Sequence, residues 1–136
     1  MDTNRDVAAL VARVLLAVLF ILSGFGKIVG FADTVGYIAS KGLPFPALMA
    51  AGAIAVELGA GLLVLVGYKA RWAAMAIFLF MIPTTLIFHN FWAVPPDQAM
   101  AEQIGFLKNV SIMGGLLMVW AFGPGRLAVG GEPMVA

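Results

Sequence analysis

The stretch ALMAAGAIAVELGAGLLVLV, residues 47–66, decides the fold class because it is apolar throughout except for one acid, Glu57. A helix needs ~17–25 residues to cross the hydrocarbon core of a bilayer, so this stretch is long enough to span a membrane. A charge at its centre costs ~2.5–3.5 kcal/mol, whereas each large aliphatic side chain returns ~0.3–0.6 kcal/mol. The helix can therefore insert, and we expect Glu57 to have a partner inside the protein.

Three further apolar runs have a comparable length, at about residues 7–25, 72–89 and 106–122. The composition agrees, since 62% of the 136 residues are hydrophobic and only 11% are charged. A soluble bundle of four buried helices would need polar outer faces, which these runs lack. The sequence predicts an all-α fold, a four-helix transmembrane bundle that forms a single domain over residues 1–136.

The longest connection, residues 26–46, contains three glycines after its first residue and two prolines, which break helices. Its middle, Phe31–Lys41, predicts a short helix at the membrane interface, with Phe31, Val35 and Ile38 on one side. We expect this segment to separate the first two membrane-spanning helices.

Breakers also delimit the fourth helix. Pro95-Pro96-Asp97, within the connection 90–103, predicts a helix stop followed by a turn. Gly123-Pro124-Gly125 predicts the end of the fourth helix, and we expect residues 123–136 to form a flexible tail.

The basic residues indicate an orientation in the membrane. Arg5, Lys69, Arg71 and Arg126 would lie on one side, and fewer basic residues on the other. Because cytoplasmic loops carry an excess of Lys and Arg, this predicts a multi-pass membrane protein with both termini in the cytoplasm. The first run has no small-x-small cleavage site after its apolar core, so we interpret it as a retained helix.

Several chemistries are excluded by composition. There is no cysteine, which removes thiol relays and iron–sulfur ligation, and the single histidine cannot form a bis-histidine haem site. A net charge of +1 without charged blocks predicts no nucleic-acid surface. The sequence also contains no nucleophile triad, phosphate-binding loop or metal-binding cluster.

Arg13 is the expected partner of Glu57, because it is similarly placed in the first apolar run. At ~1.5 Å per residue from the same side of the membrane, Arg13 lies ~9 Å deep and Glu57 ~14 Å deep, a difference that an arginine side chain can span. The pair has two interpretations. It either fixes the register of the helices or forms part of a site for a ligand, a proton or an electron carrier.

A second polar layer is expected near the opposite surface, separated from Glu57 by most of half a membrane; its members are Lys27, His89, Asn90, Lys108 and Asn109. The lysines are expected to extend to the lipid headgroups. His89 is either a hydrogen-bonded interfacial residue or a proton donor and acceptor for a quinone-like head group. The candidate catalytic residues are therefore His89 and Glu57, and the candidate ligand-binding residues are Arg13, Lys27, Lys108 and Asn109.

The order and spacing of short motifs along nearly the whole chain resemble the DoxX family of small bacterial membrane proteins, and in particular its YqjF-type members. The matching stretches are Ala12-Arg13-Val14-Leu15, Ser23-Gly24-Phe25-Gly26-Lys27, Gly42-Leu43-Pro44, Val56-Glu57-Leu58-Gly59-Ala60-Gly61, Phe88-His89-Asn90-Phe91, Leu107-Lys108-Asn109, Gly114-Gly115 and Gly123-Pro124-Gly125.

The resemblance implies a bacterial inner or plasma membrane location and a membrane subunit of a quinone-linked oxidoreductase system, such as a quinol oxidase subunit, with quinone as the ligand and redox subunits as partners. Further copies of the chain are also possible partners. It also implies that Arg13, Lys27, Glu57, His89 and Lys108 are the family's characteristic polar residues. Two alternatives remain: a non-enzymatic scaffold that stabilises partner proteins, and a transporter of protons or a small solute past Glu57. Any enzymatic activity would be that of an oxidoreductase acting with quinone or quinol.

Overall fold

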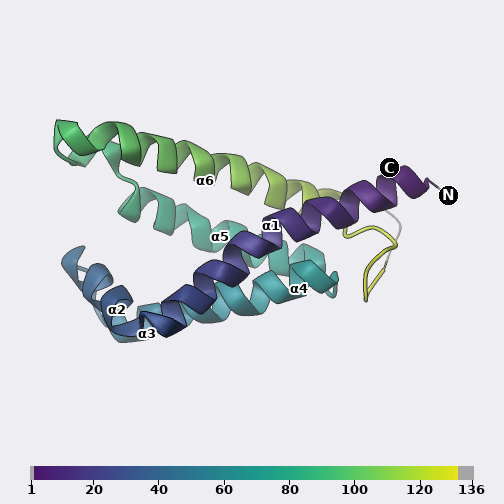
Figure 1. The fold of residues 1–136 in the computed structure, drawn as a ribbon, viewed down its shortest axis with the longest axis horizontal. Coiled ribbons are helices and arrows are strands. Elements are labelled where there is room, and N and C mark those ends of the chain that lie inside the picture. Colours follow the sequence, from purple (N-terminus) through teal and green to yellow (C-terminus); the bar gives the residue numbers. More distant parts are fainter. Residues whose placement is uncertain (1, 132–136) are drawn as a thin grey trace.

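The computed structural model describes residues 2–131 (Figure 1). Within that range, four helical stretches are long and apolar enough to cross a membrane: Thr3–Val29, Pro46–Val66, Ala70–Ala93 and Pro96–Phe122. The predicted fold class is therefore confirmed, and the protein is an all-α, four-helix transmembrane bundle.

The secondary-structure elements follow one another in simple order. They are α1 (Thr3–Val29), α2 (Phe31–Ser40), α3 (Pro46–Ile54), the π-helix η1 (Ala55–Ala60), α4 (Gly61–Val66), α5 (Ala70–Phe88), the 3₁₀ helix η2 (Phe91–Ala93) and α6 (Pro96–Phe122). The second membrane span consists of α3, η1 and α4, and α2 is the short helix predicted between the first two spans.

The fourth span begins at Pro96, earlier than the predicted start near residue 106. The prolines at positions 95 and 96 were interpreted as a stop and a turn. Proline is also well suited to the first turn of a helix, where its missing N–H is not needed and its fixed φ is already helical. Residues 96–105 therefore extend α6 by more than two turns, and this extension carries Glu102 to the functional site.

Residues 123–131, where the sequence predicts the start of a flexible tail, pack against the bundle. Gly123, Pro124 and Gly125 are buried. The backbone N–H of Val129 donates to Val66 O at 2.8 Å, and that of Arg126 donates to the Asp6 carboxylate at 3.1 Å. This segment ties the end of α4 to the start of α1, while residues 132–136 of the predicted tail lie outside the described residues.

Small residues allow α1 to approach the second span closely. A Cβ atom at Gly24 would lie 3.0 Å from Leu58 N, and one at Gly61 would lie 3.3 Å from the side chains of Phe20 and Ile21. In a bilayer, where helices gain little from burying apolar surface, such close backbone packing supplies much of their association.

The buried core and the site occupy different ends of the bundle. The core gathers residues from the half that contains the α4–α5 turn, including Ala17, Val64, Ala74, Ile77 and Leu116. At the other end of the bundle, the ribbons of α5 and α6 lie at a distance from those of α2 and α3 (Figure 1). The cavity described next is lined by residues of this end.

Candidate functional site

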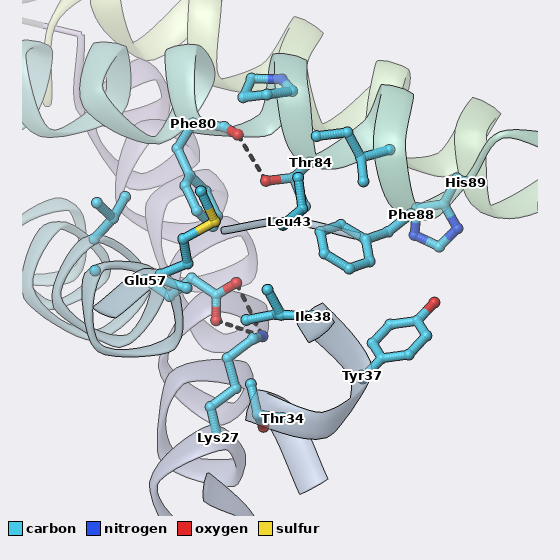
Figure 2. A pocket seen from close by; sticks show the side chains of 16 residues that line it. Lys27, Thr34, Tyr37, Ile38, Leu43, Glu57, Phe80, Thr84, Phe88 and His89 are labelled. Atoms are coloured by element: carbon cyan, nitrogen blue, oxygen red, sulfur yellow. Dashed lines mark hydrogen bonds and ion pairs between the residues drawn. The ribbon is translucent and has the colours of Figure 1, made fainter. Parts of the chain in front are cut away.

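A cavity of about 660 Å³ lies between α1, α2, the second span and α5 (Figure 2). This volume is in the range of sites for drug-sized ligands, which are usually apolar with a few placed polar groups. Its lining fits that description: the polar side chains are Lys27, Thr34, Tyr37, Glu57, Thr84 and His89, and the others are Ile38, Leu43, Met49, Gly52, Ala53, Val56, Phe80, Pro83, Ile87 and Phe88.

Glu57 is paired with Lys27, so the predicted pairing with Arg13 is wrong. The Lys27 ammonium lies 2.9 Å from Oε2 and 3.1 Å from Oε1 of Glu57, and it also donates to Ser23 Oγ at 2.8 Å. Figure 2 shows this ammonium directly below the carboxylate. The lysine side chain therefore turns inward rather than to the headgroups, because the buried carboxylate offers it a counter-ion.

Glu57 lies in the π-helical segment η1. π-Helical turns are rare and occur frequently at functional sites, since the wider turn shifts the direction of the side chains that follow. Here Glu57 faces α1 next to Gly24, where a Cβ would come 3.4 Å from Glu57 Cβ. The sequence carries no signal for this irregularity, and depth counted along regular helices selects Arg13 as the partner of Glu57.

Arg13 is almost fully buried, but at the end of α4 rather than in the cavity. Its guanidinium donates to Val64 O at 3.3 Å, to Leu65 O at 2.9 Å and to Leu127 O. The last carbonyls of a helix have no intrahelical partner and carry partial negative charge, so they suit a cation. Arg13 therefore joins α1, the end of α4 and the segment after α6, and it does not line the cavity.

His89 lies in the same cavity as Glu57, so the expected separation of two polar layers by half a membrane is wrong. Its Nδ1 atom is 3.0 Å from the Glu102 carboxylate on α6. One turn further along α6, Gly105 leaves room for the ring, since a Cβ there would lie 2.6 Å from Nδ1. Sequence reasoning missed Glu102 because residues 96–105 were interpreted as a loop; on a helix, Glu102 and Gly105 share a face.

The other two predicted ligand-binding residues are not among those that line the cavity. Lys108 is exposed on α6. The Asn109 side-chain amide donates to Thr85 Oγ1 at 3.1 Å, which joins α6 to α5. Of the expected head-group site formed by His89, Lys27 and Lys108, the structure therefore brings together only His89 and Lys27.

Tyr37 is a cavity residue that sequence reasoning did not select. It comes from α2, and its ring packs against Phe88 with the ring centroids 5.2 Å apart. Burial, and secondly the nearby Glu102 carboxylate, raises the pKa of the Tyr37 hydroxyl above its usual value of 10.0. The hydroxyl therefore stays protonated at neutral pH and can donate a hydrogen bond.

Comparisons with a family model and with known proteins point to the same family. The DoxX family model matches residues 8–90. The chain is 37% identical over 125 residues to the inner membrane protein YphA of Escherichia coli (strain K12), which covers 92% of this chain and 89% of YphA. It is also 37% identical over 129 residues to the inner membrane protein YqjF of the same organism, which covers 95% of this chain and 94% of YqjF.

A shorter similarity, 32% identity over 69 residues, relates 49% of the chain to 23% of a Surfeit locus protein 4 homolog of Schizosaccharomyces pombe. No solved structure matches the chain. Both of these E. coli relatives are inner membrane proteins, in agreement with the four membrane-spanning helices. The chain belongs to the DoxX family of integral membrane proteins.

Proposed function

We propose that this protein binds a lipid-soluble ligand with a quinone-type head group in the cavity between α1, α2, the second span and α5. The observation that carries the proposal is that the charges of the residues lining the cavity cancel. The one acid and the one lysine in it neutralise each other at 2.9 Å, and the remaining side chains are mostly apolar. Such a site suits a neutral ring with polar substituents better than an ion, which would need an unpaired opposite charge.

The position of the cavity supports a ligand that enters from the bilayer. Tyr37, Met49 and Gly52 line the cavity and are exposed rather than buried, so the cavity is open at these residues. An apolar tail can leave the site past these residues into lipid, while the ring lies among Glu57, His89 and Tyr37. An imidazole side chain such as that of His89 can both donate and accept a hydrogen bond, a property that suits a ring with polar substituents.

In this proposal the protein acts as a membrane subunit of a quinone-linked redox system in a bacterial inner membrane, with both termini in the cytoplasm. Reduction or oxidation of the ligand requires an electron donor or acceptor, which a partner subunit would supply. The relatives named above support the membrane location, and the positive-inside distribution supports the orientation.

Binding of a short-chain ubiquinone to the purified, detergent-solubilised protein tests the proposal by calorimetric titration. We expect Glu57→Gln and His89→Ala to weaken binding, and Gly114→Ala to leave it unchanged. A Cβ at Gly114 meets open space, and this residue does not line the cavity. Binding that is absent from the wild type, or equal in all four proteins, contradicts the proposal and favours a scaffold that acts through its partners alone.

A further inference from the structure

The hydrogen-bond donors in the cavity are largely used up within the protein. An ammonium group has three donors, and those of Lys27 meet Ser23 Oγ and both carboxylate oxygens of Glu57. An ionised carboxylate is an acceptor only and can accept several hydrogen bonds. The Lys27–Glu57 pair therefore offers a ligand free acceptor positions on Glu57, and no free donor.

The two threonine hydroxyls of the lining are also committed as donors. Thr34 Oγ1 donates to Gly30 O at 3.1 Å, and Thr84 Oγ1 donates to Phe80 O at 2.8 Å; the second bond is drawn in Figure 2. A hydroxyl that donates its single hydrogen still accepts through its lone pairs. Both threonines therefore present acceptors as well.

His89 is given its hydrogen-bonding direction by Glu102. Because a carboxylate accepts only, the 3.0 Å contact with His89 Nδ1 requires a hydrogen on Nδ1. In the neutral imidazole the other nitrogen, Nε2, is then an acceptor. Nε2 has no hydrogen-bond partner among residues 2–131, and it lies on the opposite side of the ring from the nitrogen that faces α6.

One lining side chain can still donate. The Tyr37 hydroxyl makes no hydrogen bond to another residue in the described part of the chain, and in Figure 2 it points toward the side of the cavity where His89 lies. The ligand therefore meets several acceptors, at Glu57, His89, Thr34 and Thr84, and a single donor.

We propose that Glu102 is a positioning residue that holds His89 as an acceptor, and that the cavity consequently prefers a head group that donates hydrogen bonds, a hydroquinone or related phenol, over the carbonyl-only quinone. The inference rests on the proposed function and refines it, because a quinone ring accepts at both oxygens and can be satisfied here only by Tyr37. A hydroquinone donates twice, to acceptors that would otherwise be left unpaired against an apolar ring.

The state of His89 can be measured without any ligand, because it is the chain's only histidine. The ¹⁵N chemical shifts of its ring at pH 8 distinguish the two neutral tautomers and the imidazolium. The charged and titratable groups around it are Glu102 on α6, Tyr37 on α2, Lys27 on α1 and Glu57 on η1. We expect the Nδ1–H tautomer in the wild type and a mixture in Glu102→Leu.

Gln103→Leu places the same leucine at an exposed neighbour on α6; it provides the matched control and should keep the Nδ1–H tautomer. An Nε2–H tautomer in the wild type, or an imidazolium at pH 8, overturns the inference. So does a tautomer that Glu102→Leu leaves unchanged, since Glu102 then does not set it.

The preference itself is tested with decylubiquinol and decylubiquinone, titrated under anaerobic conditions, and with the dimethyl ether of the quinol as a ligand of similar shape without donors. We expect the wild type to bind the quinol about tenfold more tightly than the other two, the effect of leaving a buried acceptor unpaired. In Glu102→Leu the ratio should fall, because the His89 acceptor is no longer fixed while the acceptors at Glu57 and the threonines remain, and in Gln103→Leu it should stay at the wild-type value.

The outcomes separate the two proposals. Equal binding of the three ligands to the wild type, or tighter binding of the quinone, overturns the donor preference and leaves the proposed function standing. Failure of all three to bind overturns both. A preference for the quinol that is as large in Glu102→Leu as in the wild type overturns the role of Glu102.

Discussion

At the scale of single residues, the bundle contains a buried arginine and a partly buried lysine with different partners. Lys27 faces a carboxylate, whereas Arg13 faces the carbonyls at the end of α4 and in the following segment. The difference follows from geometry. Arginine has five donors in a planar fork and can serve several carbonyls at once, while lysine acts as a compact charge that one carboxylate can neutralise. Arg13 is thus part of the scaffold, and Lys27 part of the cavity.

Replacing Lys27 by methionine should destabilise the protein by about 2–3 kcal/mol, because it leaves the Glu57 carboxylate buried without a counter-ion. The estimate is below the ~3–5 kcal/mol of fully buried pairs since the Lys27 side chain is 27% exposed. Denaturation in mixed detergent micelles measures the loss. The double variant Lys27→Met/Glu57→Leu should recover most of it; equal stability of the single variant and the wild type contradicts the role of the pair.

Gly67→Ala should lower stability by more than 1 kcal/mol, because the position has φ of +78° and a Cβ would come 2.5 Å from Arg13 Nη1. Gly36→Ala on α2, where a Cβ meets open space, is the control and should be nearly neutral. Thermal unfolding followed by circular dichroism compares the two. A neutral Gly67→Ala would show that Arg13 does not hold the end of α4.

At the scale of elements, two irregularities place the site. The π-helix η1 turns Glu57 toward α1, and the early start of α6 brings Glu102 beside His89 at the end of α5. The hydrophobic pattern of the sequence predicts neither η1 nor the early start of α6. Both features change the path of the backbone, and the positions of the apolar residues in the sequence do not reveal them. The site is therefore built where the helices depart from regular geometry, in agreement with the general tendency of π-helical turns.

The contact of α5 with α6 can be tested at Gly105. Gly105→Ala should displace the His89 ring, because the new Cβ would lie 2.6 Å from Nδ1 and 2.9 Å from Cε1. We expect ligand affinity to fall several-fold and the ¹⁵N shifts of His89 to change. Gly114→Ala, further along the same helix and with open space at the Cβ, should do neither. Unchanged shifts in Gly105→Ala would contradict the packing of His89 on α6.

At the scale of the whole molecule, one end of the bundle is closed and the other contains the cavity. The closed end combines the apolar core, the Arg13 hydrogen bonds and residues 123–131. At the other end, the cavity lies between α5 and the helices α2 and α3, where a packed apolar core would otherwise be expected. A bundle of this shape holds its helices rigidly at one end while leaving room for a ligand at the other.

The membrane-spanning fold follows directly from the sequence, because four long apolar runs have few alternatives in water or lipid. The helix at Phe31–Ser40 was also predicted from its pattern. The pairing within the site was not. Depth counted along regular helices assigns Glu57 to Arg13, whereas the Lys27 side chain turns inward and meets the Glu57 carboxylate. Glu102 was hidden because a proline pair can either stop a helix or start one.

The central claim, that the cavity is a ligand site, is tested most directly by filling it. Gly52 lines the cavity and a Cβ there meets open space, so Gly52→Leu should occupy part of the cavity without disturbing the fold. Calorimetric titration with decylubiquinol should show binding at least about tenfold weaker in Gly52→Leu than in the wild type and in the control Gly114→Leu, with all three proteins unfolding at similar temperatures. Binding by Gly52→Leu that equals that of the wild type would contradict the account.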